Sequence, residues 1–218
     1  MNEEKTVLEF FARTDNLPLA LSVASQMDVI REQMNSRFWH ELQKKLDTLF
    51  YEHAPEWQTQ VTEDRNTADM LVGLQGKLRE PQALCLFPMM EQQYIGGTWR
   101  IFYGLMWQGT PTMEHLPAAS QLKKVLGDAG FKNNENFLAW QWTDFYPRSR
   151  DFLLRFALQP EQLISELESL FRRLSLDQRA LINQANAALK GAPPSKAISL
   201  DQLRRNKRAV LRTESRHV

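Results

Sequence analysis

The clearest hydrophobic pattern in the chain is the run from Tyr94 to Trp107, YIGGTWRIFYGLMW. Apolar residues recur at every second position from Trp99 to Trp107, and Phe102 and Met106 fall on the other side. A strand with one solvated face would alternate apolar and polar residues, so this strand needs cover on both faces. We therefore predict a central strand in which Trp99 and Trp107 are mostly buried. A stacking surface for bases is the competing interpretation, but Arg100 alone interrupts the apolar run.

A second pattern has helical spacing and follows Asn16-Leu17-Pro18, which suits a helix start with Asn16 as its cap. Apolar residues then recur every three or four positions and form one face of a long helix. The pattern allows one helix, or two with a break near Asn35-Ser36, and it ends at Pro55. The stripe consists of Val23, Met27, Ile30, Met34, Phe38, Leu42, Leu46 and Leu49.

The sequence pattern of residues 57–108 predicts an antiparallel meander of three or four strands. Strands are expected near Ala68–Leu78 and Ala83–Met90, and Pro88 indicates an edge or a bulge in the second of them. Ile95-Gly96-Gly97 predicts a tight turn, because glycine tolerates the positive φ that such turns need.

The second half of the chain predicts a short helix, two strands and two helices. Pro160 begins the first of the two helices, and Ser175 with Gln178 resembles a capping box that begins the second. Antiparallel strands with helices grouped around them indicate an α+β fold. We expect a mainly antiparallel sheet of about five strands, packed by a long N-terminal helix and C-terminal helices. The elements expected in this half are a helix at Leu116–Leu126, strands at Asn136–Phe145 and Asp151–Leu158, and a last helix at Leu176–Leu189.

The composition is that of an ordinary globular protein, with 218 residues, 43 % hydrophobic and 24 % charged. We expect one domain over residues 1–191, followed by a proline-containing linker and a basic tail over residues 192–218. The acidic N-terminus does not resemble a signal peptide, and no apolar run reaches the ~20 residues of a membrane span. These features predict a cytoplasmic protein without a membrane partner. The single cysteine, Cys85, lies in an apolar run, which favours a buried side chain over a nucleophile.

The net charge of +1 hides a basic C-terminal segment. Residues 196–218 hold seven basic and two acidic side chains and carry +5, so the remainder carries −4. Contacts with nucleic acid would therefore lie in the tail, which could instead pack on an acidic protein partner or remain unbound. The loop Tyr146–Asp151 adds two arginines that could hold phosphate or carboxylate, or form a solvated turn. The candidate contacts are Arg148, Arg150, Arg204, Arg205, Lys207 and Arg208.

One arrangement has a catalytic interpretation: Asp64 followed by Gln75-Gly76-Lys77. Metal-dependent nucleases need an acid on one strand and an acid-x-lysine sequence on the next, so that carboxylates hold magnesium and the lysine positions water. Gln75 stands where the second acid would be, and an exposed turn is the competing interpretation. The four histidines share no metal-like spacing with each other or with Cys85, so we otherwise expect no metal or cofactor.

Short motifs along the chain resemble the C-terminal accessory region of bacterial and phage proteins in the PD-(D/E)xK nuclease superfamily. They are Asn16–Ala20, then Arg37–Leu42 in the long helix, Tyr103-Gly104-Leu105 in the sheet and Trp140-Gln141-Trp142, and the resemblance covers about residues 10–190. In that family the nuclease motifs lie upstream of the Phe-Trp helix. The resemblance therefore implies that the chain lacks them, which favours a non-catalytic role and leaves enzymatic activity open.

Three hypotheses follow from the sequence. The first is a non-catalytic recognition or accessory domain of a nuclease or phage-defence system, which binds a protein or nucleic-acid partner. The second is a divergent magnesium-dependent nuclease that uses Asp64, Gln75 and Lys77. The third is a homo-oligomeric interaction protein, such as a homodimer, that buries its aromatic sheet in an interface.

Overall fold

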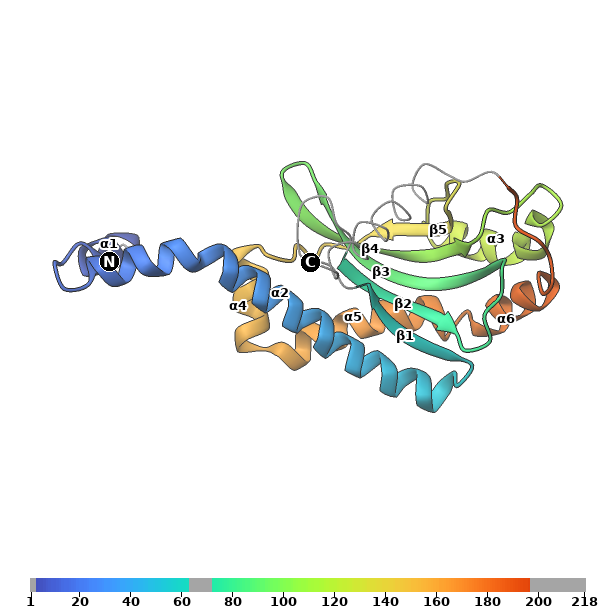
Figure 1. Ribbon diagram of the computed structural model, residues 1–218, viewed down its shortest axis with the longest axis horizontal. Helices are drawn as coiled ribbons and strands as arrows, with labels where there is room; N and C mark the ends of the chain where they lie inside the picture. Colours follow the sequence, from blue (N-terminus) through green and yellow to red (C-terminus); the bar gives the residue numbers. More distant parts are fainter. Residues whose placement is uncertain (1–2, 63–71, 197–218) are drawn as a thin grey trace, which may run out of the picture.

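A computed structural model describes residues 3–62 and 72–196 and confirms the α+β class. Its sheet is fully antiparallel, and its five strands lie side by side in sequence order (Figure 1). The strands are β1 (Trp57–Thr62), β2 (Val72–Leu78), β3 (Cys85–Ile95), β4 (Thr98–Gln108) and β5 (Phe137–Trp142). The helices are α1 (Glu3–Phe11), α2 (Leu17–His53), the 3-10 helix η1 (Leu116–Ala119), α3 (Ser120–Asp128), α4 (Arg150–Leu158), α5 (Pro160–Ser175) and α6 (Arg179–Ala188).

The predicted two-faced strand is β4, which pairs with β3 on one side and β5 on the other. Trp99 and Trp107 are 8 % and 3 % exposed, and Phe102 and Met106 on the opposite face are also buried. The prediction of a central, covered strand is therefore confirmed. Gly104 lies opposite Trp140 on β5, where an added Cβ would come 2.3 Å from the Ala139 carbonyl oxygen.

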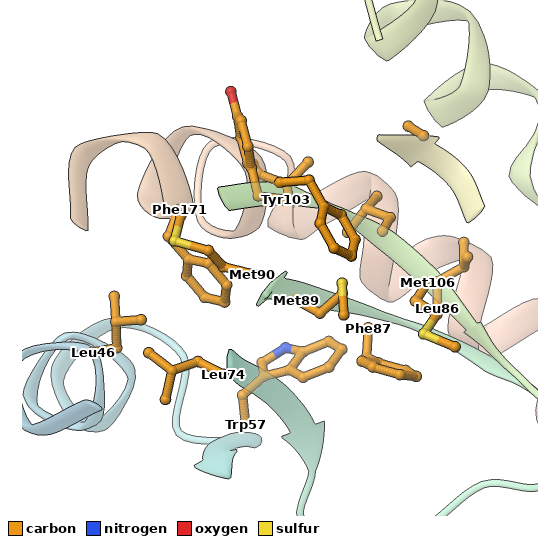
Figure 2. Packing of buried hydrophobic residues seen from close by; sticks show 14 of the residues in the cluster. Leu46, Trp57, Leu74, Leu86, Phe87, Met89, Met90, Tyr103, Met106 and Phe171 are labelled. Carbon is orange, nitrogen blue, oxygen red and sulfur yellow. The ribbon is translucent and has the colours of Figure 1, made fainter. Parts of the chain in front are cut away.

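The long helix predicted from the apolar stripe is one continuous element, α2, without a break at Asn35. Its C-terminal half packs on the sheet together with α5, and Phe38, Trp39, Leu42 and Leu46 are fully buried. Figure 2 shows side chains from α2, β2 and α5 pointing toward one interior, among them Leu46, Leu74 and Phe171.

Asn16 occupies the predicted N-cap position of α2, which begins at Leu17, but its side chain makes no capping hydrogen bond. The Asn16 amide donates to the Phe10 carbonyl oxygen at 2.9 Å and so connects α1 to α2. The sequence prediction missed α1 altogether.

Pro88 lies in β3, an interior strand of the sheet that is unpaired on one side near this residue. The pairing of β2 with β3 ends at Gln75 and Met89, so Pro88 is the first residue of β3 beyond the paired segment. The side chain of Asn186 on α6 takes the place of a neighbouring strand there. It accepts a hydrogen bond from the Leu86 N–H at 2.7 Å and donates one to the Leu86 carbonyl at 2.9 Å.

Two local predictions in the second half of the chain are wrong. The run Asp151–Leu158 is helical, within α4, because Ser149 caps the first turn and Phe152 and Phe156, four residues apart, are both buried against α2. Ser175 does not begin the last helix. Its hydroxyl donates back to the Phe171 carbonyl at the end of α5, and α6 begins at Arg179.

An ion pair fastens α6 to the start of the sheet. The Arg179 guanidinium donates to both carboxylate oxygens of Glu56, at 2.6 and 2.7 Å, and the Asn183 amide donates to the same group at 2.8 Å. Burial alone would raise the pKa of Glu56. The hydrogen bonds from Arg179 and Asn183 outweigh it and place this pKa below its ordinary value.

Candidate functional site

The N-terminal part of the chain projects away from the sheet as a helical arm, which we define as α1 together with the first half of α2, residues 3–34 (Figure 1). Every residue from 21 to 31 is exposed, whereas the same helix is buried at Phe38 and Trp39. The apolar stripe that predicted α2 therefore packs against the sheet along its second half only. From Leu17 to Ile30 its large apolar side chains are exposed.

The arm carries most of the exposed apolar surface of the described residues. Of 18 exposed large hydrophobic side chains, ten lie in the arm, although it holds far fewer residues than the remainder. Single exposed hydrophobic residues are normal, but such a concentration of them on one projecting segment indicates an interaction surface. These ten are Val7, Leu8, Phe10, Leu17, Leu19, Leu21, Val23, Met27, Val29 and Ile30.

The charges of the arm do not favour nucleic acid. Between residues 17 and 34 the charged side chains are Asp28, Arg31 and Glu32, and Arg31 pairs with Asp28 within the helix at 3.2 Å. Helix α1 adds three glutamates and one lysine. A phosphate backbone needs clustered basic residues, so the arm suits an apolar protein surface better.

The two arginines predicted as contacts, Arg148 and Arg150, lie where β5 connects to α4 rather than between two strands. Arg148 has a positive φ of 73°, and its guanidinium lies over the Trp99 ring, 5.7 Å from the centroid. Arg150 is the exposed first residue of α4. The structure therefore brings Arg148, but not Arg150, against the aromatic start of β4.

A third arginine in this region, Arg100, has a structural role. It donates to the Thr143 carbonyl at 2.7 Å and to the Asp144 carboxylate at 3.0 Å. Its guanidinium also lies over the rings of Trp142 and Tyr146, at 5.6 and 5.4 Å. These contacts anchor the loop after β5 to β4. Trp99 is buried beneath Arg148 and therefore offers no open face on which a base could stack.

The residues of the nuclease hypothesis are only partly described, because Asp64 lies outside the described residues. Gln75 and Lys77 share one face of β2. The Gln75 amide donates to the fully buried carboxylate of Glu91 at 3.3 Å, and the Lys77 ammonium lies over the Phe87 ring at 5.5 Å. The sequence prediction missed Glu91, although a charged residue in an otherwise apolar strand is a usable signal.

Gln75 and Lys77 also line a polar groove of about 550 Å³ with residues from α2 and β1, among them His40, Gln43 and Gln60. Magnesium is usually held by one or two carboxylates together with water. The described lining of the groove contains no carboxylate. Within residues 3–62 and 72–196 no group of three or more histidine, cysteine or acidic side chains is placed to hold a metal.

The predicted contacts of the tail, Arg204, Arg205, Lys207 and Arg208, lie outside the described residues. Across the part of the chain that the structure describes, no helix combines the length and the apolar character needed to cross a membrane.

The sequence predicted the helix that forms most of the arm, but it did not predict that the first half of this helix is exposed. An apolar stripe does not show which turns of the helix pack against the sheet. Leu17, Leu21 and Val29 lie outside the stripe, so apolar residues occupy several sides of this part of the helix. This distribution is the sequence signal that could have indicated a second packing surface.

Comparisons of this chain with protein-family models, with curated proteins and with solved structures give no match.

Proposed function

We propose that this chain is a recognition or accessory domain that binds a protein partner through the helical arm. The observation that supports this function is the concentration of exposed apolar side chains on residues 3–34, beside a well-packed α+β body formed by residues 35–62 and 72–196. The resemblance to PD-(D/E)xK-associated regions suggests that such a domain serves a nuclease or phage-defence system, and it motivates a non-catalytic role.

The physical argument concerns the stability of the arm. Most helices in proteins gain their stability by packing an apolar face, and the first half of α2 packs no such face against the body. Burying apolar surface contributes about 25 cal/mol per Å². A partner that covers Val23, Met27 and Ile30 would therefore stabilise this part of the helix as well as bind it.

A photo-crosslinking experiment tests this function. The photoreactive residue benzoylphenylalanine replaces Val23 in the arm or, as a control, Leu158 at the end of α4, which is also apolar and exposed (41 % and 78 %). We expect protein adducts from position 23 after irradiation in cells, and few from position 158. Equal labelling at both positions, or no adduct at position 23, would contradict the proposal.

The alternative of a magnesium-dependent nuclease predicts a separate result. Cleavage of DNA or RNA should then require magnesium and be lost in Lys77→Ala but not in Lys124→Ala, which removes an exposed lysine of α3. The proposed docking role predicts that neither purified variant differs from the wild-type chain in this assay.

A further inference from the structure

We infer that the partner of the helical arm is a second copy of this chain, which joins the first through an arm-to-arm interface. This inference rests on the proposed function and names the occupant of the same surface. Three features of the arm support it: its area, the spacing of its apolar residues and its charge.

The exposed apolar area of the arm matches what a stable dimer needs. Ten large side chains, exposed by 37 to 63 %, present on the order of 500 Å² if a full side chain offers roughly 100 Å², as about 2.5 kcal/mol at 25 cal/mol per Å² implies. A standard interface buries about 800 Å² on each partner, of which roughly 60 % is apolar. The apolar area of the whole arm, α1 included, is therefore of the size that one half of a symmetric dimer buries.

The spacing of the stripe suits helix-to-helix packing. Val23, Met27 and Ile30 are exposed and separated by four and three residues, which is the repeat that places side chains along the seam between two helices. Met34, the next residue of the stripe, already packs against the core of its own chain. Helix α1 turns back onto α2, so each arm is a helical hairpin. Two such hairpins related by a two-fold axis would form a four-helix arrangement with a shared apolar centre.

A self-complementary interface also requires that like charges do not face each other. The whole arm, residues 3–34, carries six acidic and three basic side chains, or −3, but only three of these charges lie in residues 17–34, where Arg31 pairs with Asp28. Packing of the two α2 stripes against each other therefore meets little like charge, and the acidic residues of α1 must lie at the solvated edge of the interface. The aromatic face of the sheet is a poorer interface, because Trp99 and Trp107 are already buried within the chain.

Sedimentation equilibrium of the full purified chain over a range of concentrations tests the inference. We expect a mass near twice 25.4 kDa at high concentration. Ile30→Glu should raise the dissociation constant at least about 100-fold, because the two-fold axis brings two buried carboxylates into one apolar interface. Val125→Glu is the matched control, since Val125 on α3 is 38 % exposed and Ile30 is 40 % exposed. This variant should dimerise like the wild-type chain.

Circular dichroism of both variants shows whether the body remains folded. A monomeric wild-type chain at all concentrations would overturn the inference, and so would a dimer that Ile30→Glu leaves intact. If the chain is monomeric but position 23 still crosslinks to a different protein, this inference fails and the proposed function stands. If position 23 yields no adduct at all, the proposed function fails as well.

Discussion

The side-chain amide of Asn186 hydrogen-bonds to both backbone groups of Leu86, at 2.7 Å to the N–H and 2.9 Å to the carbonyl oxygen. Both residues are buried. The amide copies the pattern of a neighbouring strand at the point where β2 no longer pairs with β3. Helix α6 thereby satisfies backbone groups that would otherwise be buried without partners.

Replacing this amide should be costly. Asn186→Ala leaves a donor and an acceptor of Leu86 unpaired in the interior, which costs about 1–3 kcal/mol for each group. We expect a loss of about 2–4 kcal/mol in the free energy of unfolding, measured by urea denaturation. Gln184→Ala, an exposed change on the same helix, should alter stability by less than about 0.5 kcal/mol. Equal effects of the two variants would show that the amide does not hold β3.

Gly104 should tolerate no side chain. Its missing Cβ would lie 2.3 Å from the Ala139 carbonyl oxygen and 2.8 Å from the Trp140 Cβ, so Gly104→Ala must separate β4 from β5. We expect a destabilisation of about 3 kcal/mol or more in thermal or urea unfolding.

The control for this change is Gly127→Ala in α3, where nothing lies within 4 Å of the added carbon. That variant should be neutral or more stable by up to about 1 kcal/mol, since alanine favours helix more than glycine does. If Gly104→Ala behaved in the same way, the close contact between β4 and β5 would be incorrect.

The ion pair between Glu56 and Arg179 should make the free energy of unfolding depend on pH. Because the pKa of Glu56 is lower in the folded chain than in the unfolded chain, the unfolded state binds more protons as the pH falls. The stabilisation is therefore complete above the ordinary carboxyl pKa and is lost as the pH drops below about 5.

Glu56→Gln should lower the free energy of unfolding by about 1–2 kcal/mol at pH 7, and by less at pH 3. Urea unfolding of both proteins at several pH values measures this difference. A difference that stays constant between pH 7 and pH 3 would contradict the assigned role of the carboxylate.

Cys85 should be chemically inert in the folded chain. Burial raises the pKa of its thiol to about 11, so little thiolate exists near neutral pH. We expect an aromatic disulfide reagent to label the native protein at pH 8 at least about 100-fold more slowly than the urea-unfolded protein. Labelling at similar rates in both states would indicate an accessible thiol and would contradict the prediction that Cys85 is inert.

The architecture of the sheet could be predicted because two independent sequence signals indicate it: the alternation of apolar residues along the strands and the glycines of the turn between them. Trp99 and Trp107 show period-two spacing, and Gly96-Gly97 supplies the turn that fixes the register of β3 and β4. Helix α4 could not be predicted because Asp151–Leu158 is a short apolar run, and such runs suit a strand or a buried helix equally well. The neighbours Phe38 and Phe152 decide between them through tertiary contact.

The candidate site was less predictable than the fold. Sequence reasoning directed attention to Arg148 and Arg150 because charged loop residues are typical contacts, yet Arg148 lies over Trp99. It overlooked the arm because apolar side chains such as Val23 and Ile30 have the same appearance in a sequence whether or not a partner covers them. Burial depends on the whole fold, and only the three-dimensional arrangement shows where the sheet ends beside α2.

Hydrogen exchange of the purified wild-type chain at low and high concentration tests most directly whether the arm is an interaction surface. Peptides from residues 38–50 should be equally protected at both concentrations, because that half of α2 packs within its own chain. Peptides from residues 17–33 should be protected strongly at high concentration and weakly at low concentration, as the arms associate and separate. Protection of residues 17–33 that does not change with concentration would contradict an arm that associates with a second copy.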